Sequence, residues 1–194
     1  EALGVGFDLK DGDVAFRANF GTVNNKGKII DRRAGRIEDT TALAKSISGK
    51  MFHGVTVFVV PSVSHRAVLV LRGKGTSAAV CDGDPHKEGL TPNKITPTQD
   101  EAHAEKTCSV LNDFLIFAHN TLKKHAFNKK RAKQGKPPAN YLLLRGAGIY
   151  NKLPSFKEKY NELKNALKQA FAQEKNVSGP KVVIGLGHPN SEQI

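Results

Sequence analysis

The chain has 194 residues, with 30 Lys or Arg against 18 Asp or Glu, and a formal net charge of +12 at pH 7. This length allows one sizeable hydrophobic core or two small ones, and no apolar run is long enough to span a membrane. Two cysteines, Cys81 and Cys108, are too few for a disulfide framework, and they favour a reducing, cytoplasmic setting. Because the chain begins with Glu, we expect a domain excised from a longer protein.

The first predicted element is a β-hairpin. Apolar residues alternate with Arg17 and Asn19 along residues 14–20, which is the period of a half-buried strand. An Asn- and Gly-rich turn at residues 24–27 leads to a second strand at 28–30. The arginine-rich segment DRRAGR at residues 31–36 follows directly.

Further elements follow from capping signals, apolar stripes and β-branched runs. They are a helix at 39–50, strands at 55–60 and 67–71, a long loop at 73–96, a helix from a capping box at 98–101 to about 124, a basic loop at 128–138, a strand at 141–144 that ends at RGAG, a helix at 155–173 and a strand at 181–186. This order predicts an α/β or α+β fold, with a mixed sheet packed by helices in a single domain.

Arginines and lysines fall in different places. The lysines lie mostly on predicted helix faces and loops, whereas seven of the eight arginines lie in or beside predicted strands: Arg17, Arg32, Arg33, Arg36, Arg66, Arg72 and Arg145. General basicity would not separate the two residue types. A preorganised site for a small anion would, because the planar guanidinium group binds phosphate and carboxylate bidentately.

Within residues 31–36, Arg32 and Arg33 point to opposite faces in regular β geometry, unless a turn at Ala34-Gly35 relaxes it. Arg33 and Arg36 are therefore slightly preferred over Arg32 as ligand-binding residues. His65 and Arg66 precede a buried strand, at an element end where functional side chains gather.

Asp82, Asp84 and His86 in DGDPHKEG have the chemistry of metal ligands, but they are few and lack a calcium-loop pattern. A substrate or interdomain contact is the preferred interpretation of this loop. Gly146-Ala147-Gly148 is only half of a dinucleotide fingerprint, so NAD binding is not favoured.

A rival hypothesis is a basic module that binds nucleic acid. Residues 123–136 contain seven Lys or Arg and no acidic residue. Only Phe127 offers a ring for base stacking there, the chain has no Trp, and no nucleic-acid-binding motif is present. Nucleic acid is therefore the less favoured partner.

Several longer segments carry a family resemblance. GDVAFRANFGTV with IIDRRAGRI, SHRAVLVLRG at 64–73 and ANYLLLRGAG at 139–148 resemble the archaeal-type cofactor-independent (2,3-bisphosphoglycerate-independent) phosphoglycerate mutases. EALGVGFDL and DGDPHKEG fit the same family, and the similarity runs from Glu1 to about Tyr160, leaving residues 161–194 unmatched as a divergent end or a junction. In that family a smaller cap domain is inserted into an alkaline-phosphatase-like core, and this chain resembles the cap.

The resemblance implies an enzyme of glycolysis and gluconeogenesis that interconverts 3-phosphoglycerate and 2-phosphoglycerate. It also implies that two divalent ions (Mn, Zn or Co) and the nucleophilic serine belong to the phosphatase-like domain, which is missing here. We therefore expect no catalytic residue or metal ligand in this chain, which should be inactive alone. The expected substrate-binding residues are Arg17, Asn19, Arg32, Arg33, Arg36, His65, Arg66 and Arg145. A sibling phosphotransferase, such as a homoserine kinase-like enzyme, is an alternative parent.

Overall fold

A computed structural model describes residues 2–152 and 156–174. The chain divides into two units, Glu1–Lys152 and Leu153–Ile194. The first unit contains, in order, the 3₁₀ helix η1 (Leu3–Val5), β1 (Val14–Val23), β2 (Ile29–Asp31), α1 (Thr41–Ile47), β3 (Lys50–Phe52), β4 (Val55–Pro61), β5 (Arg66–Arg72), α2 (Ala102–Lys124), α3 (Ala126–Lys133) and β6 (Tyr141–Ile149). The second unit contains α4 (Phe156–Glu174).

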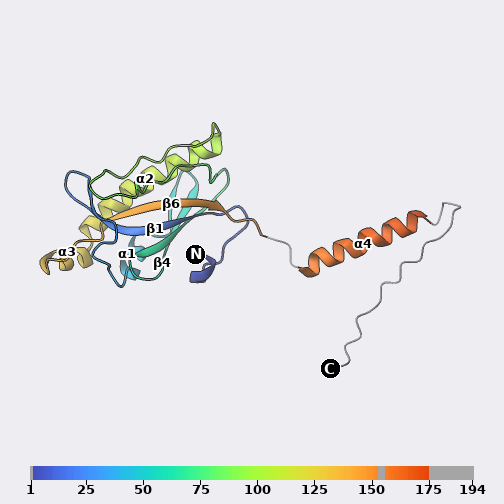
Figure 1. Cartoon of the computed structure of the whole chain (residues 1–194), viewed down its shortest axis with the longest axis horizontal. Helices are drawn as coiled ribbons and strands as arrows, with labels where there is room; N and C mark the ends of the chain where they lie inside the picture. Colours follow the sequence, from blue (N-terminus) through green and yellow to red (C-terminus); the bar gives the residue numbers. More distant parts are fainter. Residues whose placement is uncertain (1, 153–155, 175–194) are drawn as a thin grey trace, which may run out of the picture. The chain divides into compact units, whose positions relative to one another are not determined.

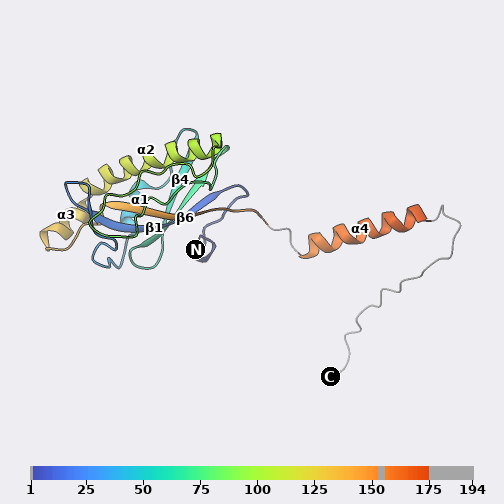
Figure 2. The same ribbon diagram turned by 45° about the horizontal axis from the view of Figure 1, so that its top comes forward.

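The strands form one sheet built around β1. Its strand order is β6-β1-β5-β4-β3, and β2 pairs with the last residues of β1. Figures 1 and 2 show β6 running beside β1, with α2 lying across the sheet. Helices packed on a sheet confirm the expected fold class. A mixed sheet was expected, but every strand pair among the described residues is antiparallel.

One face of the sheet forms the main core. Even-numbered residues of β1 lie on this face, and the alternation expected from the sequence is confirmed. They pack with residues of the neighbouring strands and with the apolar stripe of α2. The core residues of β1 and α2 are Val14, Phe16, Ala18, Phe20, Ala104, Cys108, Val110, Leu111, Phe114, Leu115, Ala118 and Leu122.

The N-terminal segment covers part of the opposite face. Val68 and Val70 of β5 form a second apolar cluster there with Phe7 and Phe58. The guanidinium group of Arg72 lies 5.3 Å from the ring centroids of both Phe7 and Phe58. Its Nη2 also donates to the Asp13 carboxylate at 2.7 Å. Arg72 therefore links this segment to the sheet through ring contacts and an ion pair.

Three local predictions were wrong. The basic segment after α2 is not a loop, because α3 occupies Ala126–Lys133. The strand expected at 141–144 continues through the RGAG segment to Ile149. The helix expected to begin at a capping box at 98–101 instead begins at Ala102, with Glu101 as an N-cap residue that makes no side-chain capping bond. The strand β3 was missed altogether.

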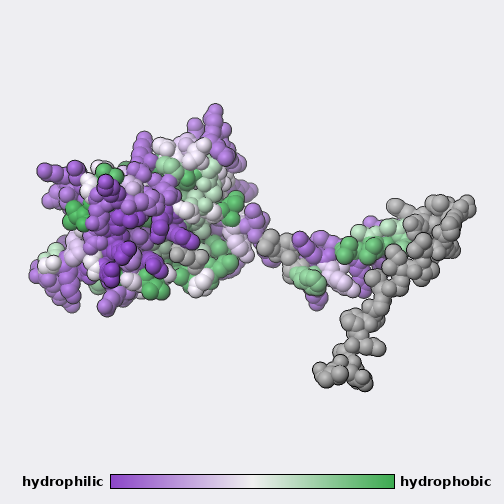
Figure 3. Space-filling view, in the orientation of Figure 1, coloured by the Kyte–Doolittle hydropathy of each residue, from purple (hydrophilic) through white to green (hydrophobic). Residues whose placement is uncertain are grey.

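The helix α4 agrees with the predicted helix at 155–173. One stripe along it carries exposed apolar side chains: Phe156, Tyr160, Leu163, Leu167 and Phe171. Figure 3 shows apolar surface on this helix among hydrophilic atoms. No helix in the described residues is both long and apolar enough to cross a membrane. The strand predicted at 181–186 lies outside the described residues.

Candidate anion-binding site

Strand register brings the distant arginines onto one face of the sheet. Arg17 of β1 is directly opposite Arg145 of β6, and Asn19 of β1 is directly opposite Arg66 of β5. Directly opposed residues of antiparallel strands project from the same face, and so do residues two apart on one strand. All four side chains therefore emerge from the face opposite the main core, beside the area that the N-terminal segment covers.

A β-bulge sets the position of Arg145. The register between β1 and β6 shifts between Ala15 and Arg17, where β6 has one extra residue. Gly146 has a φ of 63° there and donates its N–H to the Asp82 carboxylate at 2.8 Å. A bulge with glycine in the left-handed region re-aims the neighbouring side chain. Gly146, the first glycine of the GAG segment, therefore allows the bulge in β6.

The arginine-rich turn after β2 is held in an unusual backbone conformation. Ala34, Gly35 and Arg36 have φ values of 46°, 64° and 53°. The carboxylate of Asp31 accepts the N–H groups of Arg33 and Gly35 at 2.7 and 2.6 Å. Consecutive left-handed residues are unfavourable outside glycine, and such strain concentrates at ligand sites. Both Arg33 and Arg36 are exposed.

His65 connects the turn electrostatically to the sheet face. Burial lowers the pKa of its imidazole, and the positive charges of Arg66 and Arg33 lower that pKa further. Arg36 also lowers the pKa of His65, while Asp31 raises it. Because such charge effects fall off with distance, His65 lies in the field of both the turn and β5.

The arginine cluster, formed by Arg17, Arg66 and Arg145 of the sheet and Arg33 and Arg36 of the turn, contains a hydrogen-bond donor without a partner. Among the described residues, Nε of Arg145 is buried and has no hydrogen-bond partner. A buried donor without a partner is costly, so native structures rarely leave one without a reason. An anion bound at this face would accept from it.

Arg32 forms an ion pair with Asp84. Its Nε and Nη2 donate to the two carboxylate oxygens of Asp84 at 3.1 and 2.6 Å. The side chain of Asp84 is 0% exposed and that of Arg32 is 25% exposed. The two residues thus form a partly buried ion pair. The preference for Arg33 and Arg36 over Arg32 as ligand-binding residues stays a prediction.

The loop that contains Asp82, Asp84 and His86 is anchored to two strands. Gly83 and Asp84 donate their N–H groups to the Leu144 carbonyl of β6, and Gly89 donates to the Ile29 carbonyl of β2. The loop therefore borders the arginine cluster. A shallow pocket lies at this border, lined by Arg32, Arg33, His86, Lys87 and Glu88.

The divalent ions that the family resemblance implies do not fit this loop. Arg32 places its positive charge on the Asp84 carboxylate, and Asp82 is occupied by the Gly146 N–H and by Nε2 of His86 at 3.2 Å. In the described part of the chain, no three His, Cys, Asp or Glu residues are grouped so as to hold a metal ion.

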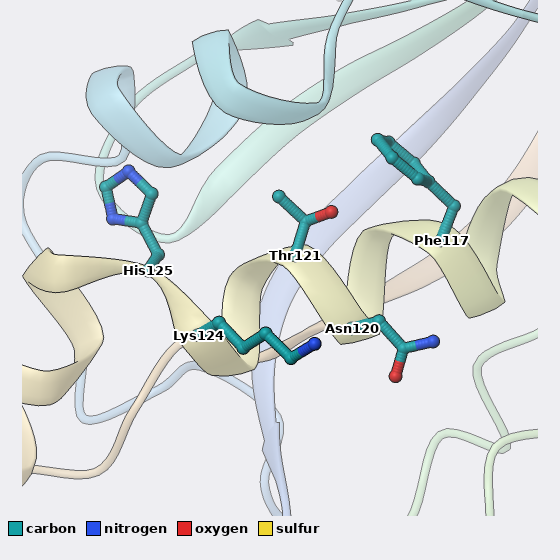
Figure 4. Close-up of a pocket in the computed structure, with 5 residues that line it drawn as sticks. All are labelled: Phe117, Asn120, Thr121, Lys124 and His125. Carbon is teal, nitrogen blue, oxygen red and sulfur yellow. The ribbon is translucent and has the colours of Figure 1, made fainter.

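A second shallow pocket lies along α2, away from these residues. Figure 4 shows its lining: Phe117, Asn120, Thr121, Lys124 and His125. It shares no lining residue with the arginine cluster, and it brings together neither acids nor arginines. We therefore assign the site to the sheet face and the turn.

Sequence reasoning missed one residue that contacts the site. Arg131 of α3 was placed in a solvated basic loop, yet its Nη2 donates to the Ala34 carbonyl at 2.8 Å. Its segment has many lysines and no apolar periodicity, so the spacing of residues did not separate it from its neighbours. The fact that it is the only arginine within residues 123–136 was the one available clue.

The opposed arginines of the sheet face, the strained arginine turn and the half-buried imidazole of His65 bring together charge and donor groups that suit a small anion. The model of the family described as 2,3-bisphosphoglycerate-independent phosphoglycerate mutase matches residues 1–128. The chain belongs to this family.

Similar proteins agree with this placement. The phosphoglycerate mutase 1 of Methanocaldococcus jannaschii is 48% identical over 163 residues, which cover 83% of this chain and 40% of that protein. The mutase of Methanococcus maripaludis is 40% identical over an alignment that covers 99% of this chain and 48% of that protein. That alignment extends into residues 161–194. The chain thus spans less than half the length of these relatives.

A solved structure shares the fold. The cofactor-independent phosphoglycerate mutase from Thermoplasma acidophilum superposes with a TM-score of 0.76 at 45% sequence identity, covering 82% of this chain and 44% of that one. The PH0037 protein from Pyrococcus horikoshii superposes less closely, with a TM-score of 0.56 at 30% identity.

Proposed function

We propose that this chain is the substrate-binding cap domain of a phosphoglycerate mutase. The observation that carries the proposal is the register of β1, which places Arg17 opposite Arg145 and Asn19 opposite Arg66 on one face. Phosphoglycerate has a phosphate and a carboxylate, and several guanidinium groups at fixed positions suit both. The family membership supports the substrate class.

In this proposal the cap binds and orients the substrate. The turn arginines Arg33 and Arg36 and the sheet arginines Arg66 and Arg145 approach the ligand from different elements. Holding both charged ends of a small molecule fixes its orientation, which lowers the entropic barrier to a reaction at its hydroxyl groups. The buried Nε of Arg145 gains an acceptor when the anion binds.

The experiment is an NMR titration of the 194-residue chain with 3-phosphoglycerate and with inorganic phosphate. We expect amide shifts at Asn19, His65, Arg66 and Arg145, with millimolar-order affinity, since only one side of the ligand is enclosed. The pKa of His65 should rise on binding, because an anion offsets the arginine charges that lower it. Binding should therefore tighten as the pH falls through the His65 pKa, once the ligand's own phosphate titration is subtracted.

Two outcomes of that titration would contradict the proposal. Shifts confined to the lysine-rich residues 123–136 would favour the rival hypothesis of a basic nucleic-acid-binding surface. A His65 pKa that does not respond to saturating 3-phosphoglycerate would place the anion elsewhere. Tighter binding of another phosphorylated hydroxy acid, such as phosphohomoserine, would point to a sibling phosphotransferase as the parent.

We also infer that the chain alone does not catalyse the mutase reaction. Phosphoryl transfer needs a nucleophile or acceptor and a cation near the transferring group, and arginines that bind reactant and transition state equally give little acceleration. The chain corresponds to about 40% of the length of its relatives. An assay of 3-phosphoglycerate conversion with Mn²⁺ or Co²⁺ should show no turnover. Turnover that Asp82→Ala or His86→Ala abolishes would contradict this inference.

A further inference from the structure

Arg131 differs from every other basic residue in its segment. Lys123, Lys124, Lys129, Lys130, Lys133 and Lys136 are exposed, whereas Arg131 is partly buried. Its Nε donates to the Pro137 carbonyl at 3.0 Å, and its Nη2 donates to the Ala34 carbonyl at 2.8 Å. One guanidinium group therefore connects two backbone carbonyls that are distant in sequence.

One of these carbonyls belongs to the strained turn. Ala34 lies between Arg33 and Arg36, and its left-handed conformation is shared by the next two residues. Such a turn persists only where its surroundings determine it from several sides. Asp31 holds it from within, through the N–H groups of Arg33 and Gly35. Arg131 contacts it from outside, through the Ala34 carbonyl.

Pro137 holds the turn as well. A Cβ added to Gly35 would lie 2.8 Å from Cγ of Pro137, so the backbone of the turn lies directly against this ring. At that distance no side chain larger than hydrogen fits without displacing the proline. Arg131 and Pro137 thus support residues 34–35 together, one by a hydrogen bond and the other by packing.

The segment at 137–140, which contains Pro137, is tied to β1 and α3 by hydrogen bonds. Oγ1 of Thr22 donates to the Pro138 carbonyl at 2.7 Å. Asn140 exchanges two hydrogen bonds with the backbone of Val23 of β1, and Asn128 of α3 exchanges two with the backbone of Ala139. Because these asparagines are buried and their bonds reciprocal, the segment at 137–140 is a rigid reference for the turn.

We propose that Arg131 is a positioning residue for the anion site. By joining the Ala34 carbonyl to the Pro137 carbonyl, it fixes the directions in which Arg33 and Arg36 leave the turn, and it does so without touching the ligand. The proposal rests on the proposed function. It also explains why an arginine stands here among lysines, because a planar fork can donate in two fixed directions and one ammonium group on a flexible stem cannot.

The test compares Arg131→Lys and Arg131→Gln with Lys130→Gln, the exposed neighbour on α3. Amide hydrogen exchange of Gly35 in the ligand-free chain reports on the turn. We expect exchange to accelerate about tenfold or more in both Arg131 variants and to stay unchanged in Lys130→Gln. Exchange at Val70 of β5 serves as the reference for an intact fold.

Phosphate affinity, measured by NMR on the same proteins, should fall about tenfold in Arg131→Lys and Arg131→Gln. A long-range charge effect would instead spare Arg131→Lys and weaken Lys130→Gln as much as Arg131→Gln. That pattern, or unchanged Gly35 exchange in both Arg131 variants, would overturn the proposal.

Failure of the proposed function gives a different result. If the unmodified chain binds neither phosphate nor 3-phosphoglycerate, the anion site itself is refuted, and the positioning role falls with it. If the unmodified chain binds normally and the Arg131 variants bind equally well, only the role of Arg131 is refuted.

Discussion

Replacing Asp84 with Asn should lower the free energy of unfolding by about 3 kcal/mol, because it removes the charge that balances Arg32. The carboxylate is 0% exposed and makes a bidentate pair with the guanidinium group, so the variant leaves a positive charge facing a buried amide. Removing one partner of a buried ion pair destabilises a protein strongly, because the other charge stays buried without a partner. Replacing both partners by apolar residues is often neutral. Since Arg32 is 25% exposed, the loss should lie at the lower end of the range for buried pairs. Urea unfolding followed by circular dichroism measures it.

The same pair gives a pH dependence of known sign. Burial raises the pKa of Asp84, but hydrogen bonds from Arg32 and from the His86 N–H lower it more, so the pKa lies below its usual range. Its stabilising contribution is therefore present above about pH 4, the usual pKa of an aspartate, and is lost as the pH falls through the lower folded value. The stability difference between the unmodified chain and Asp84→Asn should shrink below that point.

A matched control for this prediction is Asp8→Asn. Asp8 pairs with Lys10 on the surface, where the two side chains are 80% and 59% exposed. Water screens such a pair, so the control should leave the unfolding midpoint unchanged. Equal losses in the two variants would show that the Asp84–Arg32 pair has no special structural role.

Replacing Arg145 with Gln should weaken anion binding and stabilise the fold at the same time. Arg145 is directly opposite Arg17, and like charges at opposed positions of a sheet are unfavourable. Removing one of them should raise the free energy of unfolding by up to about 1 kcal/mol. The same change removes donors to the bound anion, including the buried Nε, and should weaken phosphate binding by about tenfold or more.

Opposite signs for stability and binding distinguish this explanation from simple damage to the fold. Lys50→Gln on β3 is the charge-matched control, since β3 is the other edge of the sheet and Lys50 is exposed. It should change neither quantity. Arg145→Gln with lowered stability and unchanged affinity would show that Arg145 is a structural residue.

Local patterns predicted most of the fold. The alternation in β1 and the stripe in α2 succeeded because each is long and each faces the main core. The helix α3 was missed because it is short, basic and without an apolar face, and is held by the buried Asn128. The full length of β6 was missed because Gly146 reads as a strand end, whereas it forms a bulge inside the strand.

The site was only partly predictable, because its members meet through long-range pairing. Nothing local in Arg145 shows that it stands opposite Arg17 more than a hundred residues away. The ion pair of Arg32 could not be predicted from its neighbours, because its partner Asp84 comes from a distant loop. The arginine–lysine separation pointed to the arginines, while strand register decides which of them share one face of the sheet.

The loop at 82–84 has a second consequence, for solubility. β6 is an edge strand, and an open edge invites pairing with another chain and so aggregation. Here the N–H groups of Gly83 and Asp84 occupy the Leu144 carbonyl, and the Asp82 carboxylate occupies the Gly146 N–H. The segment that borders the proposed anion site therefore also shields this part of the edge. Any substitution that releases it to alter ligand binding would at once uncover a template for intermolecular β-pairing.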